Sequence, residues 1–227
     1  MDSVAPAPRS GLLAGATGLV GRALLSVLLA SDGYRRVQVL LRHRPPDIGA
    51  NDKLQIHQVD FARLPAAFPK VDDVFIALGT TIKLAGSQAA FRQVDRDLVV
   101  NIARAAKAVG ATRLGIVSAM GADPTSRIFY NRVKGEMETA VLQIGYESVV
   151  IAQPSILLGD RAALGQPPRG GERWTARLLA PLAWTMPRGV RPIPVRAVAS
   201  ALVAAMLDAK PGVRVLKSGS MQAGDRR

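Results

Sequence analysis

The stretch that decides the fold is Gly15-Ala16-Thr17-Gly18-Leu19-Val20-Gly21, in which three glycines recur at intervals of three residues. It overlaps the end of a strand predicted for residues 11–16 and leads into residues 19–31, whose leucines recur at helical spacing. A tight turn, a close backbone approach to a ligand and a helix packed on a strand each favour a residue without a Cβ atom. The N-terminus of the following helix presents free N–H groups and a positive dipole end to an anion. The sequence therefore predicts that this turn binds the pyrophosphate of a dinucleotide, through Gly15, Thr17, Gly18, Leu19, Val20 and Gly21.

Strand-like and helical segments alternate along the rest of the chain. The predicted strands are residues 11–16, 36–41, 54–59, 73–78, 113–118, 148–152 and 213–216. The predicted helices are residues 19–31, 87–109, 127–144, 174–184 and 195–207. Strands separated by helices imply right-handed crossovers and a parallel sheet. We therefore expect an α/β protein with a three-layer Rossmann fold, a doubly wound parallel sheet and a small C-terminal substrate-side region.

Length and composition fit one such domain. The chain has 227 residues, of which 48% are hydrophobic and only 4% aromatic, so aliphatic side chains must fill the core. No internal repeat and no linker interrupts it. We expect a single domain over residues 1–227, with a cofactor-binding core at 10–156 and a substrate-side region with a closing helix at 157–217. Residues 1–9 are expected to form a flexible lead-in and residues 218–227 a flexible tail.

Composition also excludes several kinds of site. The chain has no cysteine, which rules out disulfides, thiolate metal sites and a cysteine nucleophile. Two histidines, His43 and His57, are too few for a histidine-based metal site, so no metal is expected. Glycines and Arg22 interrupt the apolar run near the N-terminus, which fits neither a signal peptide nor a membrane span. A reducing cytoplasm is the compartment that this composition predicts.

The formal net charge of +13 leaves two interpretations. A strongly basic chain attracts polyanions such as nucleic acid, acidic lipid or phosphorylated ligands. The alternative is a basic surface that is merely solvated. The basic residues are scattered, and no aromatic residues interleave with them as stacking platforms would require. Nucleic acid is therefore not expected to be the main ligand.

The end of the second predicted strand bears on which dinucleotide binds. An acidic residue at that position holds the ribose hydroxyls of NAD, whereas a basic residue favours a 2′-phosphate. Arg42-His43-Arg44 follows this strand, and the nearest acidic residue, Asp47, comes only after two prolines. NADP(H) is therefore preferred, with NAD(H) as the alternative if Arg42 is only a solvated charge. Asp60, after the third strand, could bond the adenine amino group or cap a helix that begins at Ala62.

Several further segments carry a resemblance to a known family. They are Ala-Leu-Gly-Thr-Thr (77–81), Val-Asp-Arg-Asp (94–97), Val-Ser-Ala-Met-Gly-Ala-Asp (117–123), Tyr-Asn-Arg-Val-Lys-Gly-Glu (130–136) and Gln-Pro-Ser-Ile-Leu-Leu-Gly-Asp-Arg (153–161). With the glycine-rich turn, in this order, the chain resembles the atypical short-chain dehydrogenase/reductase superfamily. Within it, the chain is similar to the Tat-interacting-protein-like oxidoreductases and to bacterial proteins called nucleoside-diphosphate-sugar epimerases.

The resemblance implies a catalytic set. Tyr130 and Lys134 lie one helical turn apart, and in this superfamily the tyrosine transfers the proton while the lysine favours the phenolate and holds the nicotinamide ribose. The alternative is an amphipathic helix with Tyr130 at the edge of the core and Lys134 in solvent. Ser118 would bond the substrate oxygen or the tyrosine hydroxyl, or else simply cap its loop. Members of the family often carry another serine or threonine shortly afterwards, where this chain has Ala119 and Met120.

The resemblance also places cofactor and substrate contacts. Ala77, Leu78, Gly79 and Thr80 would lie along the ribose and pyrophosphate, and Pro154, Ser155 and Ile156 beside the nicotinamide. Asn101 could relay protons or occupy an exposed helix face. An arginine-rich loop, with Arg161, Arg169, Arg173 and Arg177, could hold an anionic substrate group or be solvated. Trp174 and Trp184 are expected in the local core.

These observations favour an NADP(H)-dependent oxidoreductase that acts on a small carbonyl or alcohol, as a monomer or homodimer. One alternative is a cofactor-sensing regulatory or scaffold protein with little turnover, which the incomplete serine motif supports. A nucleoside-diphosphate-sugar epimerase is less favoured, because the C-terminal part is short for a nucleotide-sugar site.

Overall fold

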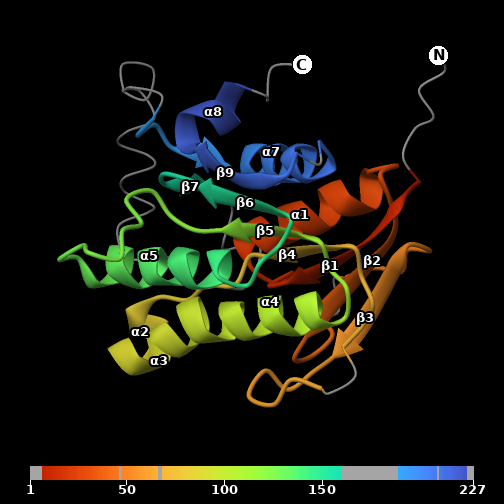
Figure 1. The fold of residues 1–227 in the computed structure, drawn as a ribbon, viewed down its shortest axis with the longest axis horizontal. Coiled ribbons are helices and arrows are strands. Elements are labelled where there is room, and N and C mark those ends of the chain that lie inside the picture. The colour runs from red at the N-terminus through yellow and green to blue at the C-terminus, as the bar shows by residue number, and fades with distance from the viewer. Residues whose placement is uncertain (1–6, 46–47, 66–67, 160–188, 209, 224–227) are drawn as a thin grey trace.

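The computed structural model describes residues 7–45, 48–65, 68–159, 189–208 and 210–223. Its main sheet has seven strands in the order β3-β2-β1-β4-β5-β6-β9, and every neighbouring pair is parallel (Figure 1). The strands are β1 (Arg9–Ala14), β2 (Tyr34–Leu41), β3 (Leu54–Gln58), β4 (Asp73–Ile76), β5 (Arg113–Val117), β6 (Ser148–Gln153) and β9 (Gly212–Lys217). The predicted doubly wound Rossmann fold is confirmed.

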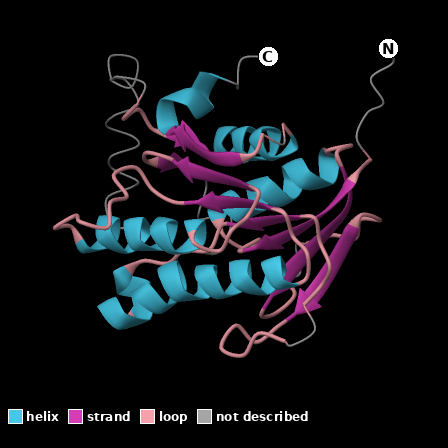
Figure 2. Cartoon of the chain, in the orientation of Figure 1, coloured by secondary structure: helices cyan, strands magenta, loops and turns pink. Residues whose placement is uncertain are grey.

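Helices cover both faces of this sheet (Figure 2). The helical segments are α1 (Leu19–Ala30), α2 (Ile82–Ala85), α3 (Gln88–Arg92), η1 (Gln93–Leu98), α4 (Val99–Ala108), α5 (Phe129–Leu142), α7 (Val195–Leu207) and α8 (Ser218–Ala223). One core, with leucines of α1 and aliphatic residues of α7, fills the first face, and a second core, under α4 and α5, fills the other. No helix in the described part of the chain is both long and apolar enough to cross a membrane.

The amino ends of the central strands are tied together by a buried carboxylate. Asp73, at the start of β4, is fully buried and pairs with the Arg9 guanidinium at 2.7 Å, while the Tyr34 hydroxyl donates to it at 2.8 Å. Arg9 therefore belongs to β1, two residues before the predicted start of that strand. Because all seven strands run the same way, their carboxyl ends meet at the opposite edge, and the order reverses there between β1 and β4.

The long predicted helix over residues 87–109 contains a π-helical segment. The backbone is α-helical in α3, widens over Gln93–Leu98 and is α-helical again in α4. Such wider turns accommodate one extra residue and often occur at functional sites. This one changes which side chains face the sheet edge, as described below.

Two other predictions differ from the structure. No helix begins at Ala62; the Asp60 side chain instead accepts the Ala62 N–H at 2.8 Å in a tight turn, and the prolines Pro65 and Pro69 disfavour a helix there. The tail predicted from Ser218 is helical as far as Ala223, because Ser218 and Met221 are both only 1% exposed against the body of the protein. A small second sheet pairs β7 (Leu157–Leu158) with β8 (Ile193–Pro194).

Candidate functional site

The glycine-rich turn forms the tight loop that its sequence predicts. Gly15 has φ +93°, and a Cβ atom on it would lie 2.6 Å from the Ala77 carbonyl oxygen. A Cβ atom on Gly21 would lie 1.9 Å from the Gly15 carbonyl oxygen, so α1 can approach β1 only with glycine at both positions. The Gly18 N–H donates to the Gly15 carbonyl at 3.0 Å, and the N-cap residue of α1, Gly18, has no side chain that could cap the helix. The N–H groups of the first turn of α1 therefore remain available to an anion.

This turn opens onto a cavity of about 440 Å³ at the carboxyl edge of the sheet. Its walls come from the ends of β1, β2, β4 and β5, from the helical segments α1, α2, α3, η1 and α5, and from β7. The lining residues are Gly15, Thr17, Gly18, Leu19, Val20, Arg42, Ala77, Leu78, Gly79, Thr80, Leu84, Ala85, Ala90, Gln93, Val94, Asp95, Val117, Ser118, Tyr130, Lys134 and Leu157. The site therefore lies where the strand order reverses, which is where open α/β sheets bind ligands.

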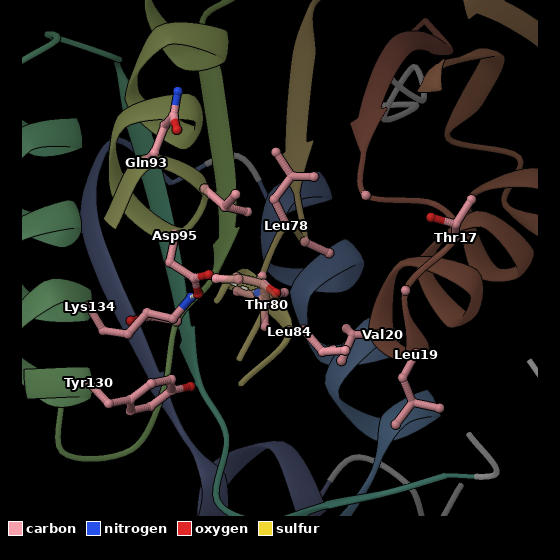
Figure 3. Close-up of a pocket in the computed structure, with 18 of the residues that line it drawn as sticks. Thr17, Leu19, Val20, Leu78, Thr80, Leu84, Gln93, Asp95, Tyr130 and Lys134 are labelled. Carbon is pink, nitrogen blue, oxygen red and sulfur yellow. Dashed lines mark hydrogen bonds and ion pairs between the residues drawn. The ribbon is translucent and has the colours of Figure 1, made fainter. Parts of the chain in front are cut away.

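Tyr130 and Lys134 extend from α5 into this cavity, one turn apart (Figure 3). Lys134 is only 4% exposed, so it is not a solvated lysine on the outside of an amphipathic helix. Tyr130 is half-buried, and its ring packs at 5.7 Å from the ring of Phe91 on α3. The helix thus presents a phenol and an ammonium group to the space beside the glycine-rich turn.

Asp95, on η1, also lies at this site, although its sequence context alone indicated no role for it. Its Oδ1 lies 2.8 Å from Lys134 Nζ, and its Oδ2 accepts the Thr80 N–H at 2.8 Å (Figure 3). The residue is 1% exposed. The only signal in the sequence was the segment Val-Asp-Arg-Asp at 94–97, because regular helical spacing does not reveal the π-helical turn that directs this carboxylate inward.

Ser118, just after β5, also reaches the cavity. The residue is 5% exposed, and its Oγ has no hydrogen-bond partner within the described chain. Its backbone N–H donates to the Ala152 carbonyl, but its hydroxyl does not cap the loop. A buried hydroxyl without a partner is costly, so a bound ligand could satisfy it.

The predicted cofactor contacts divide into two groups. Arg42 and the segment from Ala77 to Thr80 line the cavity together with the glycine-rich turn. Asp60 does not line it, because its carboxylate bonds its own turn. Pro154, Ser155 and Ile156 do not line it either, and Leu157 takes that place.

Other interactions account for the residues that stay outside the cavity. The Ser155 hydroxyl donates to the Arg191 carbonyl at 2.5 Å, and the Pro154 carbonyl accepts the Met120 N–H. Asn101 lies on an exposed face of α4. The predicted helix at 174–184, its tryptophans, and the four arginines of the 161–177 loop lie outside the described residues.

Comparison with known proteins identifies the family. Residues 15–148 match a family model described as NAD(P)H-binding. "Protein FMP52, mitochondrial" of Coccidioides immitis is 33% identical over 162 residues, which cover 66% of each chain. "Protein HTATIP2" of Rattus norvegicus is 35% identical over 173 residues, covering 74% of this chain and 69% of that protein. The chain thus spans about two thirds of the length of these curated relatives.

Solved structures agree on the fold. MoeE5 in complex with UDP-glucuronic acid and NAD superposes with a TM-score of 0.69 over 91% of this chain and 75% of that chain. The two sequences are 19% identical, so the likeness concerns the fold.

One prediction is overturned by these comparisons. A cytoplasmic location was expected from composition, but the FMP52 relatives of Coccidioides immitis, Eremothecium gossypii and Candida albicans are all named as mitochondrial. Absence of cysteine is compatible with more than one reducing compartment, so composition did not discriminate between them. The family model and the rat relative show that this chain belongs to the NAD(P)H-binding family, in the atypical short-chain dehydrogenase/reductase superfamily.

Proposed function

We propose that this protein is an NADP(H)-dependent oxidoreductase that acts on a small carbonyl or alcohol substrate. One observation carries the proposal: Tyr130 and Lys134, one turn apart on α5, line the same cavity as the glycine-rich turn. A proton-transfer group and a dinucleotide site are thus adjacent, as hydride transfer to or from a carbonyl requires.

Each residue of the site has a separate role in the proposed reaction. With the cofactor bound, the N–H groups at the start of α1 would hold the pyrophosphate, and the Lys134 ammonium group would donate hydrogen bonds to the nicotinamide ribose. The nicotinamide supplies or accepts the hydride when bound. The Tyr130 hydroxyl gives a proton to the substrate oxygen in reduction and becomes the phenolate; in the reverse direction the phenolate takes the proton of the alcohol and becomes the phenol again. The Ser118 hydroxyl, which is buried without a partner in the described chain, donates a hydrogen bond to the same oxygen.

The preference for NADP(H) rests on Arg42. It follows the carboxyl end of β2, is exposed and lines the cavity, where a guanidinium can bind a 2′-phosphate with charge-assisted hydrogen bonds. Among the lining residues only Asp95 is acidic, and Lys134 and the Thr80 N–H engage both of its oxygens. No described carboxylate is thus placed at the end of β2 to hold the ribose hydroxyls of NAD.

The test is turnover of NADPH with a panel of aldehydes and ketones, and of NADP⁺ with the matching alcohols. Tyr130→Phe should lower kcat at least about 100-fold, because a positioned proton donor contributes roughly 10²- to 10⁴-fold. Cofactor affinity, measured by titration calorimetry, should stay within about twofold of the wild type, because the phenol hydroxyl is not among the phosphate-binding groups. Turnover that survives in Tyr130→Phe would refute the proposed role of this residue.

A second candidate is a cofactor-sensing regulatory protein with little turnover. It is favoured by Ser118, whose neighbours Ala119 and Met120 lack the additional hydroxyl that many family members carry. Tight NADPH binding with no oxidation across the whole panel would support this candidate over the first.

Epimerase activity on a nucleotide-sugar has weaker support. Solved neighbours are described in complex with UDP-sugars, but this chain covers only about three quarters of them. Binding of UDP-glucuronic acid in the presence of cofactor would favour it.

A further inference from the structure

A buried pair of opposite charges lies beside Tyr130. The side chains of Lys134 and Asp95 are 5% and 1% exposed, and their charged atoms are 2.8 Å apart. A charge removed from water is tolerated only when it is paired and hydrogen-bonded. Asp95 meets both conditions, since its second oxygen accepts the Thr80 N–H. The carboxylate therefore fixes the ammonium group against the end of β4.

The backbone is built around this pair. The π-helical turn of η1 carries Asp95 toward the sheet edge, in the middle of an otherwise α-helical rod. Gly79 lies directly against it: a Cβ atom there would be 3.4 Å from Asp95 Oδ1 and 3.9 Å from Lys134 Nζ. Because Gly79 has no side chain, the pair borders the cavity itself.

The other charged groups around Tyr130 are engaged elsewhere. On the α3–η1 rod, Arg92 donates to Glu136, Arg96 forms an ion pair with Glu136 at 3.6 Å, and Asp97 pairs with Arg96. Arg132 donates to the Ser126 carbonyl, and Asp123 accepts from Thr125. The Gln153 amide links Glu138 to Lys217. Among the residues that line the cavity, the charged ones are Arg42, Asp95 and Lys134. Arg42 belongs to the opposite wall, at the end of β2. The charge that Tyr130 experiences from its own side of the cavity is thus set by Asp95 and Lys134 together.

We propose that Asp95 is a positioning residue for the Tyr130–Lys134 pair: it holds the Lys134 ammonium group at the cavity wall and offsets the charge of that ammonium beside the Tyr130 phenol. An isolated ammonium nearby would favour the phenolate, whereas a carboxylate on that same ammonium opposes it. This inference rests on the proposed function for its chemical meaning, but its test does not require turnover.

Ionisation of Tyr130 can be observed directly, because the other two tyrosines do not interfere. Burial, together with the charge of Asp73, raises the pKa of Tyr34 above its usual range, and burial raises the pKa of Tyr146 as well. Phenolate absorbance, followed against pH while far-ultraviolet circular dichroism confirms the fold, should therefore report Tyr130. Tyr130→Phe identifies its signal, since this variant must lack the transition.

Four proteins form a charge cycle. Asp95→Asn removes the carboxylate charge that faces the ammonium and should lower the pH midpoint of the Tyr130 transition by about one unit, a tenfold change in the ionisation constant. Lys134→Met leaves the carboxylate and should raise the midpoint. The double variant removes both charges and should return it close to the wild-type value. This last protein also keeps the test informative if one single variant folds poorly, because its cavity holds no unpaired charge from the pair.

Asp97→Asn is the matched control. It makes the same change of charge two residues away, but the Asp97 side chain is 42% exposed and pairs with Arg96 outside the cavity. Its midpoint should equal that of the wild type. The proposal is overturned if Asp95→Asn shifts the transition no more than Asp97→Asn does. That result would leave the Tyr130→Phe turnover test unaffected. Failure of the role proposed for Asp95 can therefore be distinguished from failure of the proposed oxidoreductase function.

Discussion

Arg42 is the residue whose side chain should decide between the two dinucleotides. Arg42→Ala should weaken NADPH binding by about 10- to 100-fold, because hydrogen bonds to charged groups contribute roughly 1.5–3 kcal/mol. NADH binding should change little, since NADH has no 2′-phosphate. Titration calorimetry with both cofactors measures this, with Arg44→Ala as the control: Arg44 is also exposed on the same segment but does not line the cavity. Equal losses for NADPH and NADH in Arg42→Ala would contradict the assignment.

Individual residues were predictable where one local rule applies. The glycines of the glycine-rich turn follow from steric limits on the backbone, and Tyr130 and Lys134 share a helix face because of their spacing. Asp95 was not predictable in this way, because its inward direction depends on a π-helical turn. Asp60 was placed in the cofactor site by its position after a strand, but a nearer backbone N–H captured its carboxylate.

The helix that carries Tyr130 is held in place by close packing on a loop. A Cβ atom on Gly135 of α5 would lie 2.2 Å from backbone atoms of Asp123 and Pro124. Gly135→Ala should therefore lower the free energy of unfolding by about 1–3 kcal/mol, although alanine favours a helix by about 1 kcal/mol. Urea denaturation measures this. An unfolding free energy equal to or above that of the wild type would show that the loop at Asp123 and Pro124 can move to accommodate the added methyl group without loss of stability.

Hydrophobic periodicity predicted which helices and strands exist better than it predicted their exact ends and internal geometry. The helix at Val195–Leu207 matches its predicted range, and β9 extends one residue beyond its prediction at each end. Residues 87–109 have continuous helical periodicity, which does not distinguish an α-helix from one with a wider turn. The short α8 was missed because Ser218, Gly219 and Ser220 are weak helix formers, and tertiary burial of Met221 prevails over that propensity.

The stability of the whole molecule should depend on His57. Burial lowers the pKa of His57, whose Nε2 lies 2.7 Å from Gln38 Oε1 between β3 and β2. The unfolded chain therefore binds this proton more readily, and stability should fall as the pH drops below about 6.5. His57→Gln should lose less Tm between about pH 7.5 and about pH 5.5 than the wild type does. The control is His43→Gln, at an exposed position, which should lose as much Tm as the wild type. If His57→Gln also loses as much Tm as the wild type, His57 is not the cause of the loss of stability in acid.

The overall topology was predictable because few arrangements satisfy alternating strands and helices with right-handed crossovers. The sheet order, with its reversal between β1 and β4, follows the expected doubly wound pattern. Whether residues 1–227 form a single domain stays a prediction, as does the choice between monomer and homodimer. Cellular location could not be derived from composition, since it is not determined by how a chain packs.

The shared direction of all seven strands also has a practical use. The ligand cavity occupies one rim of the sheet, which leaves the other rim free for attachment chemistry. Asp52, in the exposed turn before β3, lies on that free rim. Because the chain contains no cysteine, a thiol introduced there would be the sole point of coupling for a dye or a solid support, and immobilised molecules would keep their cavities open to the solution.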